Sequence, residues 1–183
     1  TVNDVESTCW NVLPYWENGE LVINSTGAGG GQYIAWRYSP VSNVINITIH
    51  VTSWTVYGHD PGIIIFSPNV GNQPSAGSAG ILLIISLYSN NLWFHTQTGN
   101  WEKLYCSLPQ PNPAFPFTFS VILTENSAGN ITVSTVYINS TAYTINVNTP
   151  FPWNQIGYIG ITPDTGNLFY VSYFSVSPAP YGG

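Results

Sequence analysis

Residues 80–97 read GILLIISLYSNNLWFHTQ, and this stretch decides the fold class. Apolar side chains fill both faces of the strand that would form here, namely Ile81, Leu82, Leu83, Ile84, Ile85 and Leu87. A strand with no polar face is covered on both sides, so we predict that it lies centrally in its sheet. Residues 89–91 have turn chemistry, and residues 92–94 begin a return strand. The stretch therefore predicts a hairpin at the centre of a β-sandwich.

The rest of the chain reads as short strands separated by turns. Residues 43–56 alternate cleanly between apolar and polar side chains, which predicts a strand with one buried and one exposed face. Residues 117–125, 131–138 and 142–147 predict an antiparallel meander with turns at 127–129 and 139–140. About twelve such strands indicate an all-β, jelly-roll-like antiparallel sandwich.

A Gly-rich stretch, TGAGGG at residues 26–31, predicts a hinge between two parts of the chain. We expect an N-terminal segment at 1–31, available as a strand donated to another molecule, and a β-sandwich domain at 32–183. A second candidate donor is the segment 169–176.

Charge is unusually scarce. Only 5% of the 183 residues are charged, with 2 Lys and Arg against 8 Asp and Glu. Two cationic side chains cannot neutralise a phosphate backbone, which excludes nucleic-acid binding. No apolar run approaches the ~18 residues of a membrane span. A surface made of neutral polar groups has few carboxylates to lose in acid, so we predict an acidic exterior environment.

The cysteines and the missing methionine indicate secretion. The chain has no Met and begins with Thr, which predicts a product whose targeting segment has been removed and which lies outside the cell, at the cell surface. Cys9 and Cys106 are the only thiols and predict one disulfide, within a subunit or between subunits. In the chain-entropy model such a long loop is worth about 4–5 kcal/mol. The alternative is two buried free cysteines.

Four N-glycosylation sequons predict that the protein carries N-linked glycans. Asn24, Asn46, Asn130 and Asn139 each begin an Asn-x-Ser/Thr motif. Asn, Ser and Thr are common in this chain, so chance matches are the alternative.

Lys103 is the only lysine, and on a strand it would share a face with Trp101 and Tyr105. Desolvation among aromatic rings lowers a lysine pKa, and a neutral amine can form an isopeptide bond with a side-chain amide or carboxyl. Glu125 is a candidate proton shuttle for that reaction. The alternative is a lysine whose stem covers a ring while its charge stays in water.

The segment GHDPGIIIFSP at 58–68 resembles the sugar-binding loop of concanavalin-type lectins, and the strand at 157–161 is similar to that sandwich as well. The resemblance implies that Asp60 and a nearby tryptophan, with Trp93 the candidate, contact a glycan. The chain lacks the acidic cluster that binds calcium and manganese in those lectins, so we expect no metal and no cofactor. A turn carboxylate that caps local N–H groups is the alternative role for Asp60.

No catalytic residue is predicted, and we expect a protein that is not an enzyme. Glu102 with Glu125 is a conceivable carboxylate pair for an acid glycoside hydrolase, and Gln97 with Glu102 for a glutamic peptidase. Neither pair falls in a recognisable motif. The three histidines are spread along the chain, which argues against a metal site.

The whole profile resembles subunits of the glycosylated thread-like filaments on thermoacidophilic archaea. That resemblance implies β-sandwich subunits joined head to tail by donor strands and sealed by isopeptide bonds, with adhesion or biofilm formation as the role. The apolar strand at 81–87 would then line a groove that needs a strand from outside. A secreted glycan-binding module is the alternative function.

Overall fold

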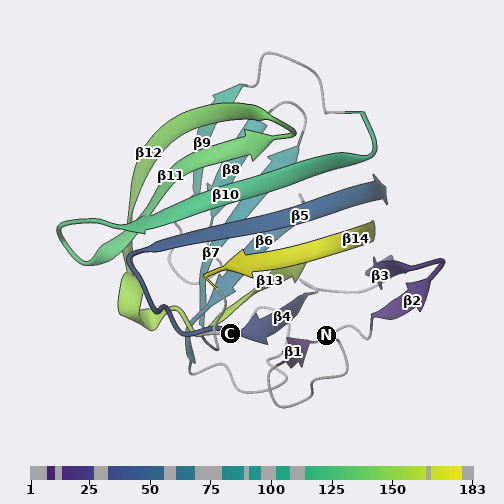
Figure 1. Cartoon of the computed structure of the whole chain (residues 1–183), viewed down its shortest axis with the longest axis horizontal. Coiled ribbons are helices and arrows are strands. Elements are labelled where there is room, and N and C mark those ends of the chain that lie inside the picture. The colour runs from purple at the N-terminus through teal and green to yellow at the C-terminus, as the bar shows by residue number, and fades with distance from the viewer. Residues whose placement is uncertain are drawn as a thin grey trace.

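The computed structural model describes residues 8–10, 14–26, 33–55, 61–68, 80–88, 91–95, 102–107, 114–163 and 166–178. For residues 8–10, 88, 95 and 102–107 it describes the backbone alone. These residues form two seven-stranded sheets that pack face to face (Figure 1). The predicted all-β antiparallel sandwich is confirmed.

The first sheet, sheet A, has the strand order β1-β4-β13-β6-β7-β8-β9. Its strands are β1 (Thr8–Trp10), β4 (Ile34–Arg37), β6 (Gly62–Phe66), β7 (Ile81–Tyr88), β8 (Asn91–His95), β9 (Glu102–Ser107) and β13 (Tyr158–Thr162).

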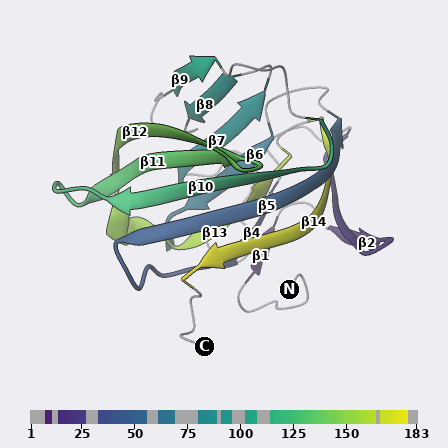
Figure 2. The ribbon, with the colours of Figure 1, turned by 45° about the horizontal axis from the view of Figure 1, so that its top comes forward.

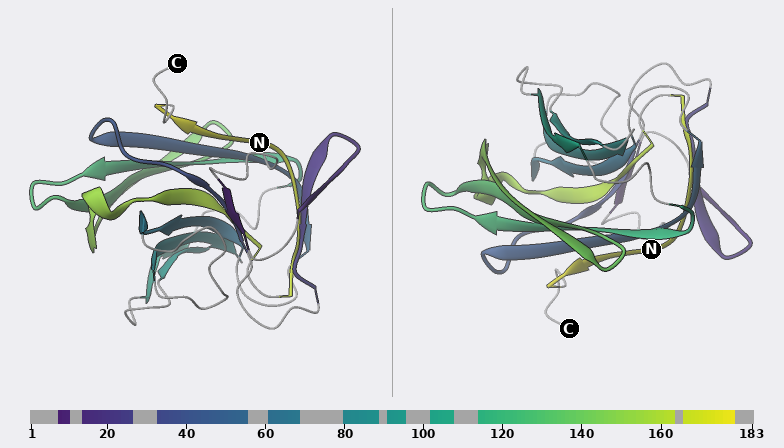
Figure 3. Two further views of the ribbon diagram at one scale, coloured as in Figure 1. Left: turned by 90° about the horizontal axis from the view of Figure 1, so that it is seen from below. Right: turned by 90° about the horizontal axis from the view of Figure 1, so that it is seen from above.

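The second sheet, sheet B, has the order β12-β11-β10-β5-β14-β3-β2. Its strands are β2 (Tyr15–Glu17), β3 (Glu20–Asn24), β5 (Val44–Thr55), β10 (Phe117–Glu125), β11 (Asn130–Ile138), β12 (Thr141–Pro152) and β14 (Leu168–Ser177). A three-residue 3-10 turn, η2 (Trp153–Gln155), leads from β12 towards β13. Figure 3 shows the two sheets as separate layers.

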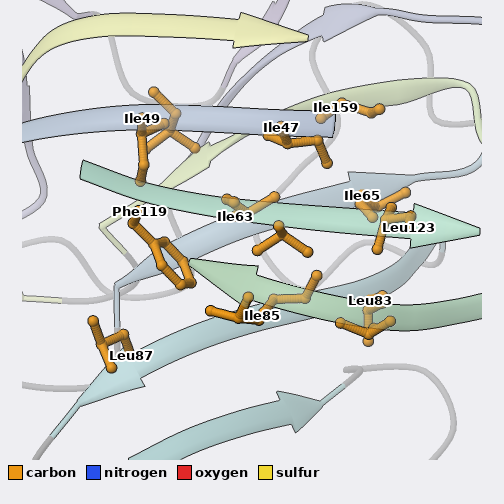
Figure 4. Close-up of a cluster of buried hydrophobic side chains, with 14 of the residues drawn as sticks. Ile47, Ile49, Ile63, Ile65, Leu83, Ile85, Leu87, Phe119, Leu123 and Ile159 are labelled. Carbon is orange, nitrogen blue, oxygen red and sulfur yellow. The ribbon is translucent and has the colours of Figure 1, made fainter. Parts of the chain in front are cut away.

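The core between the two sheets buries the apolar side chains on one face of residues 81–87. Leu83, Ile85 and Leu87 of β7 are fully buried against side chains of sheet B such as Phe119 and Leu123 (Figure 4). Burying one such side chain contributes about 1.5–3 kcal/mol, so this layer is the main source of stability.

A second apolar cluster buries side chains on the other face of β7. It lies on the outer face of sheet A and consists of Tyr33, Ala35, Ile64, Phe66, Ile81, Ile84 and Tyr158. Ile84 is 1% exposed although it points away from the central core. The strand β7 is therefore covered on both faces, and it pairs with β6 on one side and β8 on the other. The predicted central hairpin is confirmed.

The alternating pattern of β5 is also confirmed. Ile45, Ile47 and Ile49 are fully buried between the sheets, whereas Asn46 and Thr48 lie on the outer face of sheet B. The strands β10, β11 and β12 form the predicted meander, with turns at the predicted positions.

Two short strands were not predicted. Neither residues 8–10 nor residues 15–17 carry an apolar alternation that predicts a strand, yet β1 pairs with β4 and β2 pairs with β3. Each is three residues long, too short for a periodicity to register. The β2–β3 hairpin projects from one end of the sandwich (Figure 2).

Both predicted donor segments already have partners in the same chain. Leu21 and Ile23 lie on β3 between β2 and β14, and the segment 169–176 lies in β14 between β3 and β5. With β7 also paired on both sides, the fold gives no support to the prediction of a groove that needs a strand from another subunit. No helix within the described ranges has the length and apolar character needed to cross a membrane.

Candidate functional site

The predicted glycan contact Trp93 lies on the outer face of sheet A, at one end of a row that crosses four strands. Trp93 of β8 stands opposite Ser86 of β7, Ser86 stands opposite Gly62 of β6, and Gly62 stands opposite Thr162 of β13. Neighbouring strands are about 4.8 Å apart, so Gly62 and Trp93 are separated by about 10 Å along the sheet. These four residues are called the outer row below.

Exposure changes along the outer row. Ser86, Gly62 and Thr162 are buried, whereas Trp93 is half-buried and reaches solvent. A Cβ atom on Gly62 would lie 2.1 Å from the carbonyl oxygen of Ile85, so only glycine fits where β6 passes β7. Only Trp93 in the outer row therefore reaches solvent, and its indole face is a surface on which a flat apolar ring face can stack.

The second predicted contact, Asp60, lies outside the described residues. Pro61 and Gly62 follow it directly in the chain, and both are buried. Because Gly62 begins β6 and belongs to the outer row, the chain enters sheet A two residues after Asp60 and two strands from Trp93. The fold therefore brings the segment next to Asp60 to the same end of the same sheet as Trp93.

The outer face of sheet B carries polar side chains that hydrogen-bond one another across neighbouring strands. The Nδ1 atom of His50 lies 3.0 Å from the Oγ1 atom of Thr118, and the hydroxyls of Thr48 and Ser120 are 2.9 Å apart. Cross-strand pairs of this kind are typical of a solvated sheet face. We therefore place the candidate site on sheet A.

Two tyrosines, Tyr170 and Tyr38, have raised pKa values. Partial burial raises the pKa of Tyr170, and the nearby Glu17, Tyr15 and Glu20 raise it further. Burial also raises the pKa of Tyr38, whose hydroxyl donates a hydrogen bond to the carbonyl oxygen of Pro178 at 2.8 Å. Neither tyrosine belongs to the outer row.

Sequence reasoning missed one contact on sheet A. Arg37 of β4 is the only arginine of the chain, and its guanidinium lies 5.8 Å from the ring centre of Tyr158 on β13. Its Nη2 atom donates to the Tyr158 hydroxyl at 3.4 Å. The only feature of the sequence that pointed to Arg37 was the rarity of cationic residues, and that rarity does not show which ring the guanidinium would contact.

The structure separates the backbones of the two cysteines. Cys9 lies in β1 and Cys106 in β9, and these strands are the opposite edges of sheet A with five strands between them. A disulfide needs Cα atoms within about 7 Å. The strand order therefore does not support an intrachain bond, and a bond between two chains stays a prediction.

The remaining chemical candidates are not brought together into a site. Lys103 stands opposite Phe94 in the β8–β9 register, and its side chain lies outside the described residues, as does Gln97. Glu102 belongs to β9 of sheet A, whereas Glu125 is exposed at the end of β10 in sheet B. In the described ranges no three His, Cys, Asp or Glu residues gather where they could hold a metal ion.

Sequence comparison finds a viral relative. The chain is 60% identical over 186 residues to ORF1334 of Acidianus two-tailed virus, which is named as a transmembrane protein. The match covers 99% of this chain but 14% of the viral protein, so the chain spans about one seventh of that relative's length. No family model matches the sequence.

Structural comparison finds sandwiches of carbohydrate-recognition proteins. The potassium-bound carbohydrate recognition domain of Emp46p matches with a TM-score of 0.58 at 12% identity, covering 98% of this chain and 90% of that one. The exoplasmic/lumenal domain of VIP36, bound to Ca²⁺ and Man3GlcNAc, matches with 0.56 at 11%, covering 94% and 84%. Sheep galectin-11 in complex with glycerol matches with 0.52 at 11%, covering 78% and 95%. At these identities the likeness establishes the fold alone, a two-sheet antiparallel β-sandwich.

Proposed function

We propose that this chain is a carbohydrate-binding module whose binding surface is the outer face of sheet A around Trp93. The observation that carries the proposal is the outer row, in which the solvent-reaching indole of Trp93 lies two strands from Gly62, where β6 begins. In this proposal the indole of Trp93 is the stacking surface, and the carboxylate of Asp60, which precedes Pro61 and Gly62 in the sequence, supplies hydrogen-bond acceptors for sugar hydroxyls.

The comparisons support this function over filament assembly. Emp46p is described as having a carbohydrate recognition domain, and VIP36 is described in complex with an oligosaccharide. The fold by itself does not define a function, because function belongs to sites on folds. The proposal therefore rests on Trp93 and Asp60 together with the fold, and it includes an extracellular location in which glycans are the ligands.

The electrostatics of the chain fit a neutral ligand. With a formal net charge of −6 and two cationic side chains, the protein has little to offer an anionic polymer. Neutral oligosaccharides, recognised by stacking and hydroxyl contacts, are the ligand class that this surface suits.

The test is a glycan-binding measurement on the purified chain. A glycan array identifies the tightest neutral oligosaccharide, and calorimetry then compares wild type with Trp93→Ala and Asp60→Asn. We expect each variant to weaken binding at least tenfold, equivalent to about 1.4 kcal/mol. Trp93→Tyr, which keeps a ring, should retain most of the affinity.

Trp16→Ala is the matched control. Trp16 is 55% exposed on β2 of sheet B, so its removal deletes an accessible indole on the other sheet from the outer row. Binding by Trp16→Ala should equal that of wild type. Full affinity in Trp93→Ala, with the melting temperature unchanged, would contradict the proposal, as would the absence of any glycan ligand.

A further inference from the structure

All four sequons of the sequence lie on one side of the sandwich. Asn24 ends β3, Asn46 lies in β5, Asn130 begins β11, and Asn139 lies in the turn between β11 and β12. Every one of these elements belongs to sheet B. The sequons are therefore on the opposite layer from Trp93.

The sequon at Asn24 is open and already shaped as a turn. Asn24 and Thr26 are exposed, and the Oδ1 atom of Asn24 accepts hydrogen bonds from the backbone N–H of Thr26 at 3.0 Å and from its hydroxyl at 2.5 Å. The middle residue, Ser25, is buried and exchanges hydrogen bonds with the backbone of Asn167 at 2.8–2.9 Å. Ser25 thus anchors the turn while its two neighbours stay in solvent.

The sequon at Asn130 is closed. Thr132 is 7% exposed, and its hydroxyl donates to the Oδ1 atom of Asn148 at 2.6 Å and accepts from the Nδ2 atom of Asn126 at 3.2 Å. The backbone N–H of Asn130 donates to the Oδ1 atom of Asn126 at 3.0 Å, and its carbonyl oxygen accepts from the Asn126 N–H at 2.9 Å. The hydroxyl that defines this sequon is therefore buried and engaged.

From this contrast we propose that the folded domain is N-glycosylated at Asn24 and not at Asn130. The Nδ2 atom of Asn24 attacks the anomeric carbon of an oligosaccharide held as a glycosyl phosphate on a lipid carrier. The new N–C bond forms as the C–O bond to phosphate breaks, the phosphate leaves with the electron pair, and Nδ2 loses one proton. The Asn24 Oδ1 atom keeps its hydrogen bonds to Thr26, so the turn need not open for the transfer.

The other two sequons differ in how their backbone is held. Asn46 is exposed, but β5 is paired along both sides by β10 and β14, so its backbone is not accessible in the folded chain. Asn139 is exposed in a hairpin turn, and its Oδ1 atom accepts from the N–H of Thr118 at 3.1 Å. A glycan on either residue would extend from sheet B, the opposite layer from Trp93.

The test is an acceptor assay on the folded, unglycosylated chain. The chain is incubated with membranes that contain an oligosaccharyltransferase and its lipid-linked donor, and occupancy at each asparagine is measured by mass spectrometry of proteolytic peptides. Synthetic peptides 20–28 and 126–134 show in the same membranes that both sequons are acceptors when unfolded. In the folded chain we expect at least tenfold higher occupancy at Asn24 than at Asn130.

Two variants separate recognition from folding. Thr26→Val should abolish occupancy at Asn24 with the melting temperature unchanged, and Thr26→Ser should retain it. Equal occupancy at Asn130 and Asn24 in the folded chain would overturn the proposal, and so would an unmodified Asn24 beside a modified peptide 20–28. The glycan-binding test of Trp93 is independent of either result.

Discussion

Asn139 shows how a single residue holds a turn. Its φ is +54°, in the left-handed region that asparagine tolerates, and its side chain accepts the N–H of Thr118. Asn139→Ala should lose both features and cost about 1–2 kcal/mol of unfolding free energy. Asn139→Gly keeps the backbone freedom and should cost less. Denaturant unfolding of the unglycosylated chain measures both variants, and an alanine variant as stable as wild type would contradict this role.

Gly160 shows how closely two strands of sheet A approach. A Cβ atom there would lie 2.1 Å from the carbonyl oxygen of Ile34 on β4, and backbone atoms cannot give way cheaply. We expect Gly160→Ala to cost about 1–3 kcal/mol or more, lowering the melting temperature by several degrees. Gly129→Ala is the comparison, since nothing lies within 4 Å of its Cβ position and only its φ of +79° opposes the change. A smaller loss at Gly160 than at Gly129 would show that the strands can separate there.

At the scale of elements, the spacing of apolar residues correctly predicted the long strands and which of their side chains are buried. The alternation in β5 and the two-faced apolar run in β7 each follow from which side chains meet the cores. The three-residue strands β1 and β2 carry no period, and their pairing is set by neighbours distant in sequence. Trp93 was predicted as a glycan contact from the resemblance to concanavalin-type lectins, which implies a tryptophan near Asp60. Its place in the outer row depends on strand order, which no local pattern contains.

The two faces of β7 make a direct prediction. Ile85 packs into the central core and Ile84 into the outer cluster of sheet A, and both are buried. Ile84→Ala and Ile85→Ala should therefore each cost about 2–5 kcal/mol. Thr144→Ala, at an exposed position on β12, is the control and should change stability little. If Ile84→Ala behaves like the control in denaturant unfolding, the outer cluster is not a real core.

At the scale of the whole molecule, the strand order accounts for the apolar stretch without the strand from another subunit that was predicted from sequence. The apolar side chains on both faces of residues 81–87 predicted a groove for a strand from another subunit. In the structure β7 pairs with β6 and β8 of the same chain, and two apolar clusters of that chain bury its two faces. Composition alone does not distinguish these cases, because either arrangement buries the same side chains. The low number of charged residues and the four sequons indicate what the surface of the protein is made of and where the protein acts. They carry no information on whether subunits assemble into a filament.

Tyr38 ties the two layers together and gives the stability a predicted pH dependence. It follows β4 of sheet A, and its hydroxyl donates to Pro178, which follows β14 of sheet B. Burial raises the pKa of Tyr38 in the folded state above its ordinary value of 10.0. Its contribution is therefore fully present below pH 10 and is lost as the pH rises towards the folded-state pKa. The difference in unfolding free energy between wild type and Tyr38→Phe should shrink above pH 10, and a difference that grows there would have the wrong sign.

The measurement that tests the central claim most directly is chemical-shift mapping of the isotope-labelled chain during titration with its tightest neutral oligosaccharide. We predict that the perturbed signals are the indole N–H of Trp93 and the backbone amides of Ser86 and Gly62. The signals of His50, Thr118 and Tyr173 on the outer face of sheet B should stay in place. Perturbations that gather on sheet B and leave Trp93 unchanged would contradict the account.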